Sequence, residues 1–301
     1  MNHRQLIKSL DLDLRRELTV KSNLIAGIHV LGHVTCMALL IWPIIARVPF
    51  WKLVMLPLGI VTIFLFTLLH ETIHRNAFVQ NWLNQLVARI CGFLILVPAT
   101  WFRQFHLEHH RETQNPDKDP ELASPRPATL RQFLWHITGL PLWASLCGSL
   151  FNSAAGKMET YIPQSSRRDV RIEAIISLGL YGVLAGVSFY YQNPVLLFIW
   201  VIPVLLGQPF LRLYLLAEHA MCPHSDNMLE NSRTTHTNWL VRKLSWNMPY
   251  HVEHHAYPGV PFYQLPKLYE LIKPNHHITA DGYLGFYRVF ISHLLAGPSK
   301  N

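Results

Sequence analysis

Four long apolar stretches dominate the pattern of hydrophobic and polar positions along the chain. They cover residues 24–46, 50–69, 172–191 and 195–216. Each has about the 20 residues that a helix needs to cross the hydrocarbon core of a bilayer. Arg47-Val48-Pro49 separates the first two stretches, and Gln192-Asn193-Pro194 separates the last two. The pattern predicts an all-α integral membrane protein with four transmembrane helices.

The segments outside these stretches are largely polar. Residues 1–22 are basic, and we expect them to form a surface helix on the membrane. Residues 111–130 are a Pro-rich loop, and residues 217–301 form a polar, aromatic and His-rich cap. No internal repeat or low-complexity segment divides the chain. We therefore expect residues 1–301 to form a single membrane domain.

Histidines recur in three clusters of one design, each at the end of an apolar stretch. The clusters are His70-Glu71-Thr72-Ile73-His74, His106-Leu107-Glu108-His109-His110 and His251-Val252-Glu253-His254-His255. Positions i, i+3 and i+4 of a helix share one face, so each cluster points two or three imidazoles in one direction. Together they offer eight imidazoles, whereas one zinc takes about four ligands. The clusters predict a pair of redox metals, and imidazole suits iron.

Two shorter apolar runs need a different interpretation. Residues 83–101 contain Arg89 and Pro98, and residues 133–151 contain Gly139 and other interruptions. A full crossing by residues 83–101 would put the first two clusters on opposite faces of the membrane, where they share no metal. We therefore expect both runs to be re-entrant or interfacial.

Composition and charge agree with a membrane location. Only 15% of the residues are charged, whereas about a quarter of a soluble domain is charged. The net charge of +8 comes from Lys and Arg in the loops, which favours a membrane surface over nucleic acid as the partner. Four crossings place both termini and all three clusters on one side, which the positive-inside rule makes cytoplasmic. The 4 cysteines form no CxxC pair, so we expect no disulfide framework and no iron–sulfur cluster.

The metal interpretation also predicts residues that support or extend the clusters. A metal-bound histidine is held in one orientation, usually by a nearby carboxylate. The candidates for this role are Glu71, Glu108, Glu253, Asp117 and Asp119. Two irons have room for more ligands than eight imidazoles supply. His219 is the best ninth ligand, because it directly follows the last apolar stretch, where an ionisable residue is a functional candidate.

The remaining histidines have simpler interpretations. His224 and His236 are weaker candidates for metal binding. The lone residues His29, His33 and His136 are expected to be structural, and His276-His277 is expected to be a solvated loop pair.

A dinuclear histidine site of this kind binds and reduces dioxygen, and the resulting oxidant removes hydrogen from an unactivated C–H bond. Side chains alone do not supply such redox chemistry. We expect two non-haem irons, dioxygen as co-substrate, and neither haem nor flavin. A lipid-like substrate would enter from the bilayer and lead its reacting carbon to the metals.

The three clusters, in this order and between these apolar runs, resemble the histidine boxes of the membrane fatty acid desaturase superfamily. This superfamily also holds hydroxylases, carotenoid ketolases and alkane hydroxylases. The resemblance runs from about residue 50 to 275 and includes the stretch 246–255, Trp-Asn-Met-Pro-Tyr-His-Val-Glu-His-His. The second box and its Asp-Pro-Glu sequel look like a bacterial branch, whose members desaturate acyl chains or small amino-acid-like compounds.

The resemblance implies further features. The box histidines and one histidine after the last crossing, here His219, hold the two irons. Stearoyl-type enzymes have an asparagine one turn before that histidine, where this chain has Leu215, so a tenth ligand is absent or is replaced by water. The chain carries no fused electron carrier, which implies a separate ferredoxin-like or cytochrome-like donor with its reductase. A bacterial inner membrane is the expected location.

Other functions stay open at this point. Hydroxylation or ketolation of a hydrophobic substrate begins with the same hydrogen removal as desaturation, as does desaturation of a small amino-acid-like metabolite. The first cluster also fits HExxH, a zinc peptidase signature, but that reading leaves the other clusters unexplained. A metal transporter is disfavoured, because transporters place ionisable residues near the bilayer midplane and these clusters lie at the ends of spans.

Overall fold

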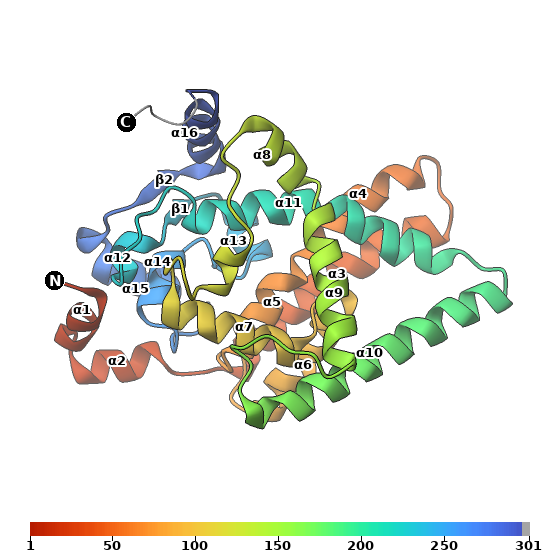
Figure 1. The fold of residues 1–301 in the computed structure, drawn as a ribbon, viewed down its shortest axis with the longest axis horizontal. Coiled ribbons are helices and arrows are strands. Elements are labelled where there is room, and N and C mark those ends of the chain that lie inside the picture. Colours follow the sequence, from red (N-terminus) through yellow and green to blue (C-terminus); the bar gives the residue numbers. More distant parts are fainter. Residues whose placement is uncertain (297–301) are drawn as a thin grey trace.

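The computed structural model describes residues 1–296 and shows a helical protein with one pair of short strands (Figure 1). Within this part of the chain, four helical segments are long and apolar enough to cross a membrane: Leu12–Ile45, Trp51–Ile73, Gln164–Tyr190 and Leu197–His219. They correspond to the four apolar stretches of the sequence. The predicted all-α membrane fold with four spanning segments is confirmed.

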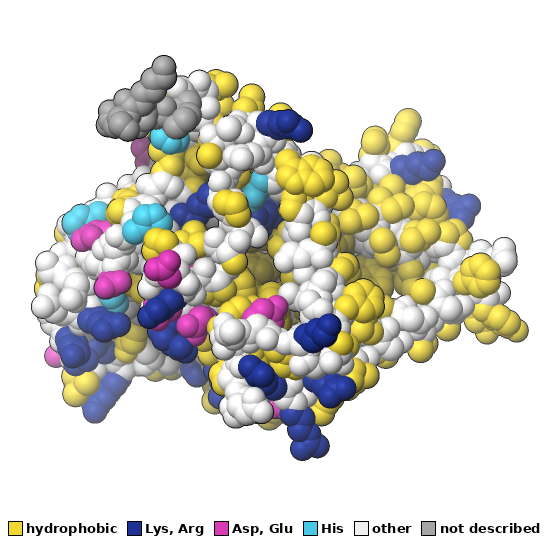
Figure 2. All heavy atoms as spheres, in the orientation of Figure 1, with side chains coloured by type: hydrophobic (Ala, Val, Ile, Leu, Met, Phe, Trp, Pro, Cys, Tyr) yellow, Lys and Arg dark blue, Asp and Glu magenta, His cyan; other side chains and the backbone are white. Residues whose placement is uncertain are grey.

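The spanning segments form the right-hand part of the molecule in Figure 1. They contain the helices α3 (Asn23–Ile45), α4 (Trp51–Ile63), α5 (Leu65–Ile73), α10 (Gln164–Tyr190), a π-helical turn (Leu197–Val201) and α11 (Ile202–His219). Hydrophobic side chains cover this part of the surface in Figure 2, and large residues such as Leu31 and Val183 are exposed. An exposed apolar surface of this kind suits contact with lipid rather than water.

Helices α4 and α11 pack closely against each other. Gly59 and Gly207 face each other across this contact. A Cβ atom on Gly59 would lie 2.0 Å from the carbonyl oxygen of Pro203, and one on Gly207 would lie 2.1 Å from the carbonyl oxygen of Gly59. Small residues allow two helix backbones to approach in this way inside a membrane.

The run predicted to be re-entrant does not form one continuous helix. It is divided into α6 (Asn81–Leu94) and α7 (Ala99–Glu112), which are bent by 101° relative to each other. Side chains from the spanning segments satisfy backbone groups at this break. Tyr181 Oη donates to Phe93 O at 2.8 Å and Trp200 Nε1 donates to Leu94 O at 2.7 Å. An apolar surrounding requires such partners for open helix ends.

A carboxylate caps the helix that begins after the break between α6 and α7. Glu173 of α10 accepts hydrogen bonds from the first two N–H groups of α7, those of Ala99 and Thr100, at 3.1 and 2.6 Å. An anion at a helix N-terminus satisfies free donors and interacts well with the helix dipole. Glu173 therefore fixes the start of the helix that carries the second histidine cluster.

The second interrupted run is also divided. It forms α8 (Leu130–Ile137) and α9 (Leu140–Ala154), with Gly139 between them at a positive φ of 72°. Neither helix alone is among the candidate spans.

The remaining elements form a polar cap over the ends of the spans, at the left in Figure 1. They are α1 (His3–Ser9), α2 (Leu12–Leu18), the 3-10 turn Pro120–Ala123, α12 (Met228–Asn231), β1 (Thr234–His236), α13 (Trp239–Leu244), α14 (His251–Ala256), α15 (Leu265–Ile272), the 3-10 turn Lys273–Asn275, β2 (Thr279–Asp281) and α16 (Gly282–Ala296). The two strands pair in parallel.

Residues 1–22 form two short helices rather than the single surface helix that the sequence predicted. This segment forms α1 and α2, and it packs against the cap. Leu6, Ile7 and Leu18 are buried, and the backbone N–H of His3 donates to Asn227 Oδ1 at 2.9 Å. The apolar residues of the segment pack against the rest of the protein. The basic residues between them made this packing difficult to predict from the sequence.

Candidate metal centre

Four helices bring the predicted histidines together where the spanning helices meet the cap. Helix α5 carries the first cluster, α7 the second and α14 the third, and His219 is the last residue of α11. The bend between α6 and α7 turns the second cluster back toward the first. All nine predicted histidines contribute to one site: His70, His74, His106, His109, His110, His219, His251, His254 and His255.

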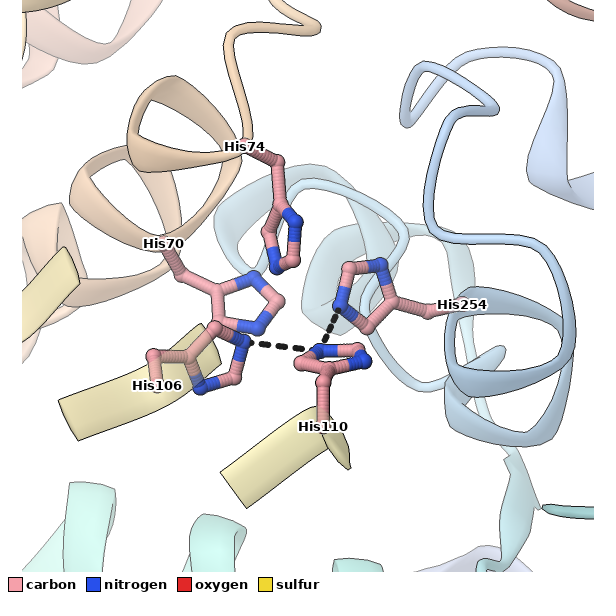
Figure 3. A group of neighbouring side chains, drawn as sticks. All are labelled: His70, His74, His106, His110 and His254. Atoms are coloured by element: carbon pink, nitrogen blue, oxygen red, sulfur yellow. Dashed lines mark hydrogen bonds between the residues drawn. The ribbon is translucent and has the colours of Figure 1, made fainter. Parts of the chain in front are cut away.

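The first group contains five rings, from His70, His74, His106, His110 and His254 (Figure 3). One nitrogen of each ring lies within 4.8 Å of the corresponding nitrogens of the others. His110 Nε2 lies 2.9 Å from His106 Nε2 and 3.0 Å from His254 Nε2. Three separate helices contribute to this group, so the group forms only when the chain is folded.

The second group is built from the other four rings. Nitrogens of His109, His219 and His255 lie within 4.8 Å of one another. His219 Nε2 also lies 3.2 Å from His109 Nε2 and 2.9 Å from His251 Nε2. The rings of His110 and His255 stack with centroids 4.1 Å apart, which joins the two groups.

The spacing of the nitrogens fits shared cations. Two ligand nitrogens at right angles around one cation, each about 2.1 Å from it, lie about 3 Å apart. Four Nε2 pairs have separations of 2.9 to 3.2 Å. Several other ring nitrogens, including His74 Nε2 and His255 Nε2, are buried without a hydrogen-bond partner. Buried donors and acceptors normally have partners, so these rings fit a metal centre.

Groups behind the second set of rings orient them. His109 Nδ1 lies 2.9 Å from Asp119 Oδ1, and His219 Nδ1 lies 3.0 Å from the carbonyl oxygen of Asn231. Glu218 Oε1 lies 3.4 Å from His251 Nδ1 without forming a hydrogen bond to it. An acceptor at Nδ1 favours the proton there and leaves the Nε2 lone pair free for a metal.

Of the five carboxylates predicted for this orienting role, only Asp119 is hydrogen-bonded to a cluster histidine within residues 1–296. Glu108 pairs with Arg111, Glu71 accepts from the Phe262 N–H, Glu253 accepts from Thr234 Oγ1, and Asp117 is exposed. Neighbours in sequence point about 100° apart around a helix, so a glutamate next to a ligand faces away from it. The roles predicted for these four residues have no contact to support them.

Sequence reasoning missed two of the groups that lie behind these rings. Glu218 adjoins His219 but contacts His251, and Asn231 acts through its backbone carbonyl. No sequence pattern predicts either contact. Glu218 could have been considered as a candidate, because it is a carboxylate beside a predicted ligand at the end of a span.

The other histidines are placed as follows. His224 bonds the carbonyl oxygen of Gln114 and His236 contacts Tyr269, so neither weaker candidate belongs to the two groups. The prediction that His276-His277 is a solvated pair is wrong for His276. Its side chain is 3% exposed and its Nε2 lies 3.2 Å from Glu253 Oε1.

Burial keeps His74 and the three rings of the third cluster neutral. Burial lowers the pKa of His74 to about 3, with nearby Arg103 and His109 adding to the effect. Burial and neighbouring histidines also hold the pKa values of His251, His254 and His255 well below 6.5. Desolvation penalises the charged imidazolium. A neutral ring is the form that binds a metal.

A cavity of about 760 Å³ leads to the histidines. Its floor includes His70, His106, His109, His219 and His251. Apolar and aromatic side chains from several helices line much of the wall, and the hollow near the centre of Figure 2 is lined with hydrophobic atoms. This volume is within the range of pockets that bind one small ligand. Leu215 also lines the cavity, at the position considered for a tenth ligand.

Fold and site together define a membrane-embedded protein with a histidine-rich centre at the end of an apolar cavity. Residues 47–286 match the fatty acid desaturase family. The chain therefore belongs to this family, as its histidine boxes predicted.

Several curated proteins are similar to the chain. The sn-1 oleoyl-lipid 12-desaturase of Picosynechococcus sp. is 29% identical over 82% of this chain and 75% of its own length. The sn-1 acyl-lipid omega-3 desaturase (ferredoxin) of Nostoc sp. is 26% identical over 70% of this chain and 64% of its own length. The dihydrorhizobitoxine desaturase of Bradyrhizobium elkanii is 26% identical over 67% of this chain and 61% of its own length.

Proposed function

We propose that the protein is a dioxygen-dependent di-iron desaturase that introduces a double bond into a fatty acyl chain. The observation that carries the proposal is the convergence of nine histidines, five of which line a largely apolar cavity. Family membership and the names of the relatives support desaturation as the reaction.

In this proposal the two groups of rings hold two irons. His70, His74, His106, His110 and His254 would bind one, and His109, His219, His251 and His255 would bind the other. Bound iron would supply the electron transfer and dioxygen reduction that amino-acid side chains lack. The distribution of the nitrogens in two groups supports two ions rather than one.

The residues of the chain position the substrate and exclude water. Phe66, Phe102 and Leu142 present apolar surface in the cavity, against which an acyl chain is more stable than in water. Asp119 and the Asn231 carbonyl keep two of the rings aligned, and a rigid surrounding shell is what holds a reacting C–H bond close to the metals.

The relatives favour desaturation over hydroxylation or ketolation, because those described above are all named desaturases. One of them is named for dihydrorhizobitoxine rather than for a lipid, so desaturation of a small metabolite is the second candidate.

The electron donor and the orientation are also part of the proposal. A separate ferredoxin-like or cytochrome-like protein with its reductase would supply electrons, and the Nostoc relative is named with ferredoxin. The histidine side and both ends of the chain would face the cytoplasm of a bacterium, because the basic loops lie on that side of the predicted topology.

Profiling of lipids and metabolites in cells that express the chain tests the proposal. We expect a new double bond with the wild type and none with His254→Ala, whereas His277→Ala, at an exposed position, should retain the product. Metal analysis should find two irons in each chain. A new hydroxyl or keto group would replace the proposal with the hydroxylase or ketolase alternative. One zinc and no His254-dependent product would contradict it.

A further inference from the structure

The spanning helix α11 carries a cation that the metal centre does not use. Arg212 lies about two turns before His219, and its side chain lines the cavity. A guanidinium is charged at every accessible pH, and charges within membrane spans are costly and mark functional sites. We therefore expect the positive charge of Arg212 to have an anionic partner.

The protein supplies Arg212 with only a neutral partner. Arg212 Nη2 donates to the ring of His136, 2.9 Å from its Nε2, while Arg212 Nε is buried without a hydrogen-bond partner. Burial and the guanidinium together lower the pKa of His136 to about 4, so the ring carries no charge at neutral pH. A neutral imidazole accepts a hydrogen bond but does not compensate the positive charge.

Five carboxylates line the cavity with Arg212; of these, Glu218 lies 3.4 Å from His251 Nδ1 and Asp117 is exposed. Asp119 accepts from His109, and Glu159 accepts from Ser149 Oγ at 2.9 Å. Glu121, whose field reaches Arg212, has a carboxylate oxygen 3.7 Å from His109 Nδ1. Within residues 1–296 no carboxylate lies within 4.0 Å of Arg212. The guanidinium is thus left available to an anion in the cavity.

We propose that Arg212 binds an oxyanion, a carboxylate or a phosphate, that is attached to the apolar substrate. The apolar surface of Leu142 and Leu146 in the same cavity then receives the hydrocarbon part, and the chain extends toward the histidines. The fork of N–H groups on a guanidinium matches both oxyanions. The helix between Arg212 and His219 rises by about 10 Å, so the anion is held well away from the reacting carbon. The inference rests on the proposed acyl substrate and adds that this substrate is acidic.

Ligand binding to the purified, iron-loaded protein in detergent tests this inference without a need for turnover. The probes share one chain and differ at one end: palmitate, methyl palmitate and hexadecyl phosphate, at a pH well above the carboxyl pKa. Calorimetric titration compares the wild type with Arg212→Gln, Arg212→Lys and a control, Arg131→Gln, at an exposed position of α8 outside the cavity lining.

We expect an anionic probe to bind the wild type and the Arg131 variant at least about tenfold more tightly than the methyl ester. Arg212→Gln should remove this preference and leave ester binding unchanged, and Arg212→Lys should keep part of it. Preference for palmitate assigns a carboxylate, and preference for hexadecyl phosphate assigns a phosphate.

Equal binding of ester and anions to the wild type would overturn the inference, and this comparison needs no variant to fold. An anion preference that survives in Arg212→Gln would overturn it as well. Failure of the proposed desaturation is recognised separately, because it would leave no new double bond in expressing cells whatever the binding data show.

Discussion

The contact between α4 and α11 offers a test of the link between membrane packing and the metal centre. Gly207→Ala adds one methyl group where the helices are closest. Its Cβ would lie 2.1 Å from the carbonyl oxygen and 2.4 Å from the carbonyl carbon of Gly59. Both obstacles are backbone atoms, so no side-chain rotation relieves them, and the helices themselves must move.

The size of the effect follows from these distances. Ordinary contacts of a Cβ begin at 3.4 Å, so the helices must separate locally by about 1.3 Å, the difference between 3.4 and 2.1. Overpacking of a tight contact costs about 1–3 kcal/mol. Alanine regains roughly 0.5–1 kcal/mol of that through its better helix propensity. We expect a net loss of about 1 kcal/mol, and at most roughly 2.5 kcal/mol, of folding free energy.

The separation of α4 and α11 should also displace the histidines of the metal centre. Helix α11 ends at His219, and α4 continues into α5, which carries His70. A misplacement of about 1 Å in a positioned site can reduce the rate about 100-fold. Gly207→Ala should therefore lose more activity than its fall in stability explains.

Thermal unfolding in detergent, together with iron content and product yield, measures both effects. Gly186→Ala in α10 is the matched control, because a Cβ there meets nothing within 4 Å. The control should unfold at the wild-type temperature or slightly above it. A Gly207→Ala protein that is as stable and as active as the control would refute the close approach of α4 and α11 and the argument built on it.

Three further outcomes are expected. Asp119→Asn should weaken metal binding about 10- to 100-fold, because it removes the charged acceptor behind His109. The control Asp117→Asn, at an exposed position, should keep the wild-type affinity. Competition with a chelator measures both affinities, and equal values would count against the orienting role of Asp119. Glu173→Gln should lower the unfolding temperature, because an amide offers one acceptor oxygen to the two N–H groups at the start of α7. An unchanged unfolding temperature would show that this cap does not contribute to stability. Removal of the metals should destabilise the protein, because buried nitrogens lose their partners, and calorimetry with and without a chelator tests it.

The histidines were predictable because their signal is local. The spacing within each cluster places rings on one helix face whatever the rest of the chain does, and His219 is marked by its place at the end of a span. The four spans were predictable for a similar reason, since bilayer thickness sets a length that a single stretch of sequence satisfies or fails. Both predictions used only neighbours in sequence.

The predictions that failed needed contacts between distant residues. The glutamates inside the clusters contact other groups, and the carboxylate that lies 3.4 Å from His251 Nδ1 is Glu218, from another helix. His276 is buried because the loop after α15 folds over Glu253. The unpaired state of Arg212 is likewise invisible in sequence, because it depends on which carboxylates of other segments already have partners.

The bend between α6 and α7 connects these observations. The first two clusters are separated by a chain segment long enough to carry the second away across the membrane, yet His74 and His106 have ring centroids 4.9 Å apart. Turning the chain back exposes backbone groups at two helix ends in an apolar surrounding, which is unfavourable unless they find partners. Tyr181, Trp200 and Glu173 supply those partners from the spanning segments. The spans therefore do more than anchor the protein, because their side chains stabilise the break that allows two histidine clusters to meet.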